Sequence, residues 1–420
     1  MELSTSNERR RLEALDRAAI EGHQLARLNE LLAAVLPQNE FYAAKLGRGP
    51  LKLASLTELA ELPFTTKQDL VTSGAGEGAG NRTFPLERYI RFHQTSGTSG
   101  RPLPVYDTAD DWRWWVNCWQ YVLDAAAITA DDRALLAFSF GPFIGFWSAF
   151  DALVDRGTLV IPGGGMSSLA RLDLIKRTGA TALFCTPTYA LRLVEVAGEH
   201  QIDLKALSVR KIIVAGEPGG SLPAVRERIE RAWQARVTDH AGATEIGPWG
   251  YGSVAGTGLH ILETEFIAEF LAVDSNSPAE GGVAELVLTP LGRIGSPVIR
   301  YRTGDLVRPM RSSDGFVILD GGVLGRVDDM LVIRGVNVFP TSVEQILRSF
   351  AEVAEYRLTV RKRGAMDELL VEVEDQMQQP DRIAAELQLR LGLTIDVRLA
   401  PAMSLPRFDG KGRRFVDERG

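Results

Sequence analysis

The middle of the chain alternates short apolar runs with segments whose apolar residues recur at helical spacing. The runs lie at residues 134–138, 158–161, 182–185 and 211–215, and the helical patterns lie at 169–176, 190–200 and 222–233. Strands that are apolar on both faces are typical of parallel sheets covered by helices on both sides. The pattern predicts an α/β fold, in which ligands gather at the carboxyl ends of the strands.

Turns rich in polar residues and glycine follow three of these segments. They are Thr186-Pro187-Thr188, then Gly216-Glu217-Pro218-Gly219, and then the stretch from Asp239 to Glu245. Because these turns are expected at the ligand-binding edge of the sheet, they supply candidate site residues.

The second half of the chain has a different pattern. Strands with short links are predicted at residues 265–273, 283–289, 298–302, 306–310 and 316–319, which indicates a small antiparallel sheet or barrel. From about residue 326, strands at 358–360, 369–373 and 395–399 combine with helices at 341–350 and 380–391. We therefore expect a large N-terminal domain, 1–325, followed by a small C-terminal α+β domain, 326–420.

Two other helical or apolar segments need interpretation. Residues 134–150 carry no charge, but they are short of the ~20 residues of a membrane span and are broken by Gly141-Pro142. We interpret them as a strand, a turn and the start of a helix. Residues 110–121 are predicted to form a tryptophan-rich helix. We interpret its face with Trp112, Trp115 and Trp119 as core or a subunit contact, and the alternative is a ligand-binding face.

Composition narrows the class of protein. With 420 residues, 45% apolar and 24% charged residues, the chain is typical of a globular protein of two to three domains. A net charge of -7 argues against bulk nucleic-acid binding, although a local basic site remains compatible with it. The start lacks a secretory signal, and Cys118 and Cys185 lack metal-ligand spacing. We expect a cytoplasmic protein without a membrane partner.

A hydroxyl-rich loop follows a predicted strand at residues 89–92. Its glycines let the backbone curl so that N–H groups and hydroxyls can point at one anion, and its arginine adds positive charge. No Gly-Lys-Ser/Thr follows, so it is not a Walker loop. The alternatives are a phosphate-binding loop and a plain Ser/Gly hairpin turn, formed by Thr95, Ser96, Gly97, Thr98, Ser99, Gly100 and Arg101.

Further motifs occur in a fixed order along the chain. They are Ala243-Thr244-Glu245, 301–306 (YRTGDL), 325–330 (GRVDDM), 334–340 (RGVNVFP) and 405–414 (LPRFDGKGRR). Together with the loop at 95–102, this series resembles the adenylate-forming superfamily of acyl-CoA ligases, most closely its phenylacetate–CoA ligase branch. Each motif alone is weak, but the ordered set spans nearly the whole chain.

The resemblance implies roles in ATP binding. The loop at 95–101 would hold the phosphates, Thr244 a phosphate oxygen and Glu245 a Mg²⁺ ion. Asp305 would accept hydrogen bonds from the ribose hydroxyls, a role that suits an acceptor-only carboxylate, and Arg326 would help to hold ribose and phosphate. The adenine and ribose would lie against Ala215, Gly216, Glu217, Pro218, Asp239, His240, Ala241 and Gly242.

The resemblance also implies two geometries for two steps. Lys411 would reach the α-phosphate and the acid carboxylate as the catalytic lysine, and it must leave before the thiol approaches. The small domain would swivel about Asp328, which places Gly335 beside the coenzyme A tunnel. The implied cofactors are ATP, Mg²⁺ and coenzyme A.

This chain departs from the family pattern at several positions. An aromatic residue that usually stacks on adenine is replaced by Ala241, and His240 is a candidate to cover that face or else a local hydrogen bonder. Residues 252–258 contain no cysteine, so we predict no zinc. The lysine expected shortly after the loop is absent, and Arg101 is a candidate substitute.

The acid partner follows from the resemblance alone. It implies an aromatic or arylacetic acid. The candidates for the walls of the acid pocket are Phe140, Phe143, Tyr189, Pro248 and Trp249, and the alternative for each is a place in the core. Two alternatives stay open: a biosynthetic enzyme that passes its acyl group to an amine or a carrier-protein thiol, and a nucleotide-binding regulator without catalysis. A homodimer is compatible with the family and with the tryptophan face.

Overall fold

A computed structural model gives the structure of the chain. It describes residues 3–36, 38–73, 80–95, 102–138, 140–252, 258–273, 275–312, 315–329, 331–333, 336–363, 366–407 and 414–419. Thr95 is described, whereas the remaining predicted phosphate-loop residues, Ser96, Gly97, Thr98, Ser99, Gly100 and Arg101, lie outside the described residues. Gly335 and Lys411 also lie outside them.

An 11-stranded mixed sheet forms the centre of the N-terminal body, which we define as residues 3–326. The strand order is β10-β11-β12-β13-β9-β8-β7-β6-β5-β3-β4, and the last five strands are mutually parallel. These are β3 (Arg133–Leu136), β4 (Leu159–Pro162), β5 (Ala182–Cys185), β6 (Lys211–Val214) and β7 (Arg236–Ala243). The predicted α/β class is confirmed.

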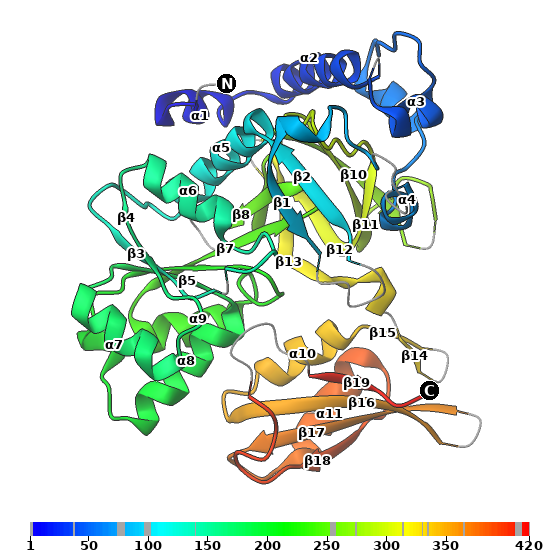
Figure 1. Ribbon diagram of the computed structural model, residues 1–420. Coiled ribbons are helices and arrows are strands. Elements are labelled where there is room, and N and C mark those ends of the chain that lie inside the picture. The colour runs from blue at the N-terminus through cyan, green and yellow to red at the C-terminus, as the bar shows by residue number, and fades with distance from the viewer. Residues whose placement is uncertain are drawn as a thin grey trace.

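Helices cover both faces of this parallel part (Figure 1). Leu183 packs with α7 (Ser168–Thr178), α8 (Pro187–Glu199) and α9 (Pro223–Trp233). Its neighbour Phe184 packs with α5 (Ala109–Ala125) and α6 (Trp147–Asp155) on the other side. Successive strand residues point to opposite faces, so an uninterrupted apolar run is the expected sequence of a strand between two cores.

The antiparallel strands continue the same sheet instead of forming a separate one. They are β8 (Gly247–Gly252), β9 (Leu259–Ile261), β10 (Phe266–Ala272), β11 (Ala284–Pro290), β12 (Tyr301–Arg311) and β13 (Val317–Arg326). The connection is β7, which pairs with β6 as far as Asp239 and with β8 from His240 onward. The prediction of a turn over 239–245 is therefore wrong for residues 239–243, which are strand.

Short helices and a small sheet complete the N-terminal body. Asp16 caps the start of a second helix after the first, because its side chain accepts from the Ala19 backbone N–H. These elements are α1 (Ser6–Leu12), α2 (Arg17–Val35), α3 (Glu40–Leu46), η1 (Leu56–Glu61), α4 (Lys67–Ser73), η2 (Leu86–Arg88), η3 (Leu204–Ala206) and the hairpin of β1 (Tyr89–Gln94) and β2 (Pro104–Thr108).

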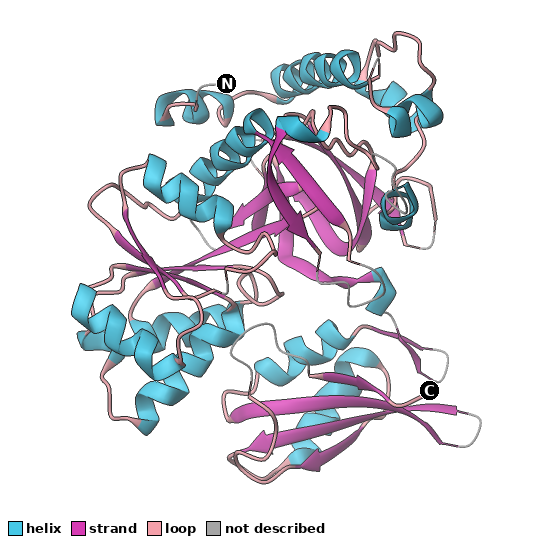
Figure 2. Cartoon of the chain, viewed as in Figure 1, coloured by secondary structure: helices cyan, strands magenta, loops and turns pink. Residues whose placement is uncertain are grey.

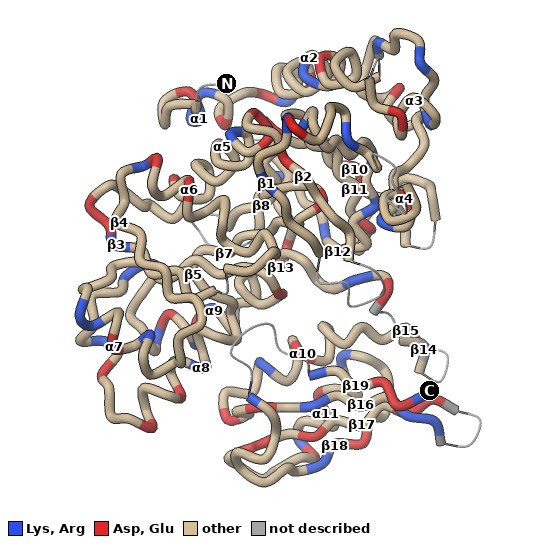
Figure 3. Tube along the Cα trace, viewed as in Figure 1, with Lys and Arg blue, Asp and Glu red and all other residues tan. Residues whose placement is uncertain are grey.

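The C-terminal unit, residues 327–419, has a core of its own. Its four-stranded sheet has the order β18-β17-β16-β19, and α10 and α11 pack on that sheet (Figures 1 and 2). The elements are η4 (Val327–Asp329), β14 (Leu331–Ile333), β15 (Val336–Val338), α10 (Pro340–Arg348), β16 (Val353–Arg363), β17 (Met366–Asp375), α11 (Pro380–Leu391), β18 (Asp396–Leu399) and β19 (Phe415–Asp417). Basic and acidic residues are interspersed in both parts (Figure 3).

The tryptophan face of α5 points into the protein. Trp112, Trp115 and Trp119 are 6%, 2% and 1% exposed. The core interpretation is therefore right, and the suggestion that this face makes a subunit contact is wrong. Among the described helices, none combines the length and apolar character that crossing a bilayer requires.

Candidate active site

A cavity of about 350 Å³ lies where the N-terminal body meets the C-terminal unit. Its walls come from the carboxyl ends of β6 and β7, from β12 and β13, and from α10, β16 and the start of β19. The lining includes Gly216, Glu217, Pro218, Asp239, His240, Ala241, Gly242, Trp249, Asp305, Arg326, Thr341, Glu344, Tyr356 and Arg414. Most of the predicted adenine and ribose residues thus share one cavity.

The loop after β6 contributes Gly216, Glu217, Pro218 and Gly219 to the lining of this cavity. Gly216 and Gly219 have φ values of +91° and +139°, a region that favours glycine. Ala215 is buried just before the loop. The Glu217 side chain turns toward α8, where Oε1 accepts from the Thr188 backbone N–H at 2.8 Å and from the Thr188 hydroxyl. Burial raises the pKa of Glu217, and the contact of this loop with adenine stays a prediction.

Asp305 and Arg326 are paired residues on neighbouring strands at the cavity wall. They lie opposite each other on β12 and β13, and Arg326 Nη1 donates to Asp305 Oδ1 at 3.3 Å. Arg326 Nη2 also lies 3.7 Å from Oδ2 of Asp328, the predicted hinge. Gly304 leaves room for the arginine, since a Cβ there would lie 2.9 Å from Arg326 Nη2. A carboxylate acceptor and a cation therefore stand side by side at this wall.

Thr244 and Glu245 occupy the tight turn between β7 and β8. Arg293 Nη1 donates to the carbonyl oxygen of Glu245 at 2.6 Å and to that of Thr244 at 3.3 Å, so a buried guanidinium holds the turn. The Glu245 side chain is largely buried, and Lys67 Nζ lies 3.4 Å from its Oε1. Burial raises the pKa of Tyr301, and the negative charge of Glu245 is the second-largest cause of this shift.

A Mg²⁺ ion fits the chemistry of this turn. One carboxylate is enough when phosphate oxygens and water complete an octahedral shell, which is the usual way Mg²⁺ binds with nucleotides. Within the described parts of the chain, no group of three or more His, Cys, Asp or Glu side chains is arranged to hold a metal ion. A metal at Glu245 would therefore depend on the nucleotide for most of its ligands.

The ends of the predicted phosphate loop are held together. Thr95 N–H donates to the Leu103 carbonyl oxygen at 3.1 Å, and Leu103 N–H donates to Thr95 Oγ1 at 3.0 Å. Beyond them, β2 carries Asp107, whose carboxylate accepts from Arg293 Nε at 2.8 Å. Burial raises the pKa of Asp107 to about 6, although Arg293 opposes this shift. One arginine thus connects the base of the loop to the Glu245 turn.

His240 lines the cavity, and contacts within the protein hold its ring. Its Nδ1 lies 2.8 Å from the carbonyl oxygen of Gly250, and its ring centroid is 4.2 Å from that of Trp119. Burial lowers the pKa of His240 to about 4, so the ring is neutral near pH 7. Burial also raises the pKa of its neighbour Asp239 to about 6, and Ser221 Oγ donates to that carboxyl at 2.5 Å.

The five candidate acyl-pocket residues are not brought together. Trp249 lines the cavity, whereas the described lining does not include the other four. Phe140 packs edge-on against Trp147 at 4.9 Å, and Phe143 is 43% exposed. Tyr189 is buried in the core and donates to Ser168 Oγ at 3.1 Å, and Pro248 pairs with Gly242 in the sheet.

Sequence reasoning missed several residues that the structure places at the site. They include Lys67, Arg293, Glu344, Tyr356 and Arg414. Lys67 begins α4, and Arg293 lies in an irregular link, so neither position carries a periodic signal. Arg414 ends the 405–414 motif, and that position was a signal available in the sequence.

Comparisons with known proteins match two parts of the chain to family models. Residues 86–264 match the model of the AMP-binding enzyme family, and residues 335–419 match that of the AMP-binding enzyme C-terminal domain. The chain is 31% identical to phenylacetate-coenzyme A ligase of Thermus thermophilus, over 97% of this chain and 98% of that one. It is 32% identical to phenylacetate-coenzyme A ligase of Escherichia coli, over 89% and 88%.

Solved structures of 2-hydroxyisobutyryl-CoA ligase are similar over the whole chain. The complex with R3-HIB-AMP in the postadenylation state has a TM-score of 0.92 at 26% identity and covers 100% of this chain and 94% of that one. The complex with 2-HIB-AMP and CoA in the thioesterification state has a TM-score of 0.74 at 27% identity, with the same coverage. The arrangement described here is therefore closer to the postadenylation structure of that ligase.

Proposed function

The chain belongs to the adenylate-forming superfamily, in its phenylacetate–CoA ligase branch, and is an AMP-forming acid–CoA ligase; on this premise we propose that its acid is aromatic or arylacetic. The observation that carries the proposal is the match of nearly the full chain to relatives named phenylacetate-coenzyme A ligase.

In the first step, a carboxylate oxygen of the acid attacks the α-phosphorus of ATP and pyrophosphate leaves. The loop from Thr95 to Arg101 binds the phosphates, Thr244 binds a phosphate oxygen, and Asp305 accepts from the ribose hydroxyls. Lys411 neutralises charge that develops on the α-phosphate. Glu245 would hold a Mg²⁺ ion, which supplies charge stabilisation to the phosphates when bound.

In the second step, the sulfur of coenzyme A attacks the carbonyl carbon of the acyl-adenylate, and AMP leaves. We propose that a small domain, 326–420, swivels against a large domain, 1–325, about Asp328, and that Gly335 then borders the coenzyme A tunnel. The separate core formed by residues from Leu331 onward supports a rigid-body movement. The difference in TM-score, 0.92 against 0.74, supports an arrangement that precedes the swivel.

Pyrophosphate exchange tests this function directly. The enzyme is incubated with ATP, Mg²⁺ and a panel containing phenylacetate, benzoate, a 2-hydroxy acid and a fatty acid, and CoA-dependent AMP release is then measured. We expect an aromatic or arylacetic acid to give the greatest kcat/KM of the panel in both assays. A higher value for the 2-hydroxy or fatty acid would contradict the substrate proposal.

The same assays distinguish the two alternatives. Exchange without CoA-dependent turnover would identify an enzyme that passes its acyl group to an amine or a carrier-protein thiol. An absence of exchange with every acid would identify a nucleotide-binding regulator. Apolar walls separate related acids by only about 1–3 kcal/mol per methylene, so the panel needs acids that differ in ring as well as length.

Two further parts of the proposal concern the setting of the enzyme. Free, buried Cys118 and Cys185 suit a reducing compartment, and we place the enzyme in the cytoplasm.

We also propose a homodimer, for which Ile90 and Phe92 offer an apolar contact because they are 60% and 46% exposed on β1. Light scattering of the wild type and of an Ile90→Lys variant tests the dimer.

A further inference from the structure

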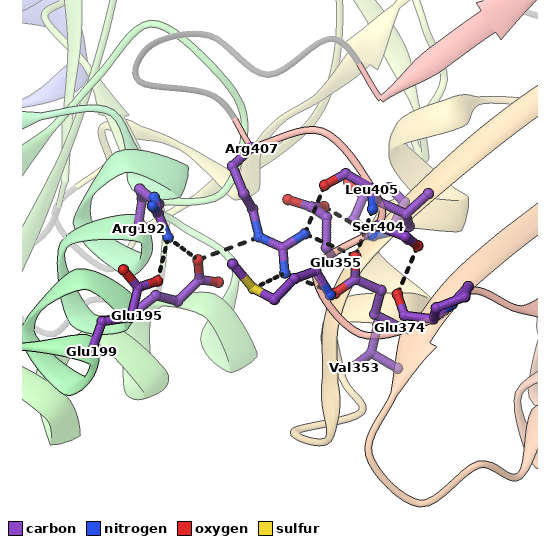
Figure 4. A network of polar contacts seen from close by, with 12 residues as sticks. Arg192, Glu195, Glu199, Val353, Glu355, Glu374, Ser404, Leu405 and Arg407 are labelled. Atoms are coloured by element: carbon purple, nitrogen blue, oxygen red, sulfur yellow. Dashed lines mark hydrogen bonds and ion pairs between the residues drawn. The ribbon is translucent and has the colours of Figure 1, made fainter.

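Arg407 lies between carboxylates from the two proposed domains (Figure 4). Its Nη1 and Nη2 donate to Oε1 and Oε2 of Glu374, at 3.0 and 2.7 Å, in a bidentate pair. On the other side, Arg407 Nε lies 3.4 Å from Oε2 of Glu195. Glu374 belongs to β17 of the small domain and Glu195 to α8 of the large domain. The guanidinium therefore joins the two domains.

Glu374 fixes the segment that carries Arg407. Its Oε2 accepts from the Met403 backbone N–H at 2.9 Å, and its Oε1 accepts from that of Leu405 at 2.8 Å. Although burial opposes ionisation, hydrogen bonds from Arg407 and from these amides lower the pKa of Glu374. The segment 403–407 is thus held to β17 by charge-assisted hydrogen bonds, so it moves with the small domain.

Glu195 is held in position on the large domain. Arg192 Nη1 donates to Glu195 Oε2 at 3.0 Å and to Glu199 Oε1 at 3.2 Å, all on α8. A second contact between the two proposed domains lies nearby: Arg228 Nη1 of α9 donates to the Val353 carbonyl oxygen at 3.3 Å. Because Arg407 is only 14% exposed, its attraction to Glu195 is screened less than that of a surface pair.

We propose that Arg407 and Glu195 form an interdomain latch that positions the Lys411 segment for acyl-adenylate formation. Lys411 follows Arg407 by four residues, a span of at most about 14 Å of extended chain. Fixing Arg407 to α8 therefore limits how far Lys411 can lie from the large domain. Arg407 and Glu195 act as positioning residues, and this inference rests on the proposed two-step function.

The latch is specific to one arrangement of the domains. A rotation of the small domain carries Arg407 and Glu374 away from α8 together, so the pair with Glu195 breaks while the pair with Glu374 survives. An interaction that is present in only one of two states shifts the equilibrium between them by its own free energy. Loss of the latch should thus weaken the first half-reaction and spare the second.

Glu195→Lys tests the latch, with Glu199→Lys as the matched control. Both variants make the same charge change on α8, but among the described side chains Glu199 pairs with Arg192 and not with Arg407. Glu195→Lys should reduce pyrophosphate exchange about three- to tenfold and leave thioester formation from supplied acyl-adenylate unchanged. Glu199→Lys should leave both reactions unchanged. An equal loss in both half-reactions, or no loss of exchange, would overturn the proposal.

A distance measurement gives a readout that does not depend on activity. Cys118 and Cys185 are buried, so spin labels can be placed at Lys176→Cys on α7 and Gln388→Cys on α11, both of which are exposed. Adding Glu195→Lys should move population away from the wild-type distance, and adding Glu199→Lys should not. An unchanged distribution in Glu195→Lys would refute the latch. If wild type shows no exchange with any acid, the proposed function fails while this measurement still decides the latch.

Discussion

Arg293 and Asp107 form an ion pair of 2.8 Å in which each side chain is only 1% exposed. Arg293 also donates to the backbone of the Glu245 turn, and Asp107 lies on β2 beside the predicted phosphate loop. Trp115 Nε1 donates to Asp107 Oδ1 at 3.1 Å. The pair therefore ties together two segments that the proposed reaction needs on the same triphosphate.

Breaking this pair should destabilise the protein strongly. Arg293→Met leaves the Asp107 carboxyl buried without its cation, so we expect a loss of about 3–5 kcal/mol in the free energy of unfolding. Urea unfolding measures it. Arg177→Ala is the control, because Arg177 and Asp173 form a pair at 64% and 59% exposure, which should contribute less than about 1 kcal/mol. Comparable losses in the two variants would contradict a special role for the buried pair.

Asp305→Ala should weaken nucleotide binding. Removing a carboxylate acceptor from a ribose costs about 1.5–3 kcal/mol, so the KM for ATP in pyrophosphate exchange should rise about ten- to hundredfold. Asp320→Ala is a suitable control, since Asp320 pairs with Arg308 on the same two strands but is not among the described cavity-lining residues. Equal KM values for the two variants would remove Asp305 from the ribose site.

Lys411→Ala should separate the two half-reactions more completely than the latch variants do. Without the lysine, charge on the α-phosphate loses its cation, and we expect pyrophosphate exchange to be abolished. Thioester formation from supplied acyl-adenylate should be preserved, because in the proposed swivel Lys411 leaves the cleft before the thiol approaches. Stopped assays of each half-reaction measure this, and an equal loss in both would contradict the swivel.

The contribution of two buried histidines to stability should fall as the pH is lowered below about 6.5. Burial lowers the pKa of His240 to about 4, and burial together with Arg293 and Arg91 lowers that of His93 to about 4. Between pH 4 and the unfolded value near 6.5, these two histidines bind more protons in the unfolded chain than in the folded chain. Their contribution to stability is therefore lost as the pH falls through this window, by at most about 3 kcal/mol for His240. Below about pH 6 the buried carboxyls of Asp107 and Asp239 act in the opposite direction, because burial raises the pKa of each to about 6.

His240→Gln tests the source of that pH dependence. Lowering the pH from 7.5 to 5 should reduce the urea midpoint less in this variant than in the wild type, even if the variant is less stable overall. His200→Gln, at an exposed position after α8, should retain the wild-type difference. An undiminished difference in His240→Gln would assign the effect to other groups.

The local sequence pattern was sufficient to predict elements that pack on two cores or present one amphipathic face. The predicted strand at 182–185 and the predicted helix at 380–391 agree with β5 and α11 at both ends. It was insufficient for β14, β15 and β19, which are three residues long. Such short strands contain less than two periods of alternation, and β19 exists by pairing with β16, far away in the sequence.

The sequence by itself determined the α/β class, the family and the residue types needed for adenylate chemistry, because motif order and periodicity are local properties of the chain. Only the tertiary structure decided that Arg293 supports the Glu245 turn, that Lys67 faces the same carboxylate, and that Arg407 reaches Glu195. Each of these contacts joins residues far apart in the chain. Their proximity depends on how the sheet, the helices and the two proposed domains pack together, which no local pattern encodes.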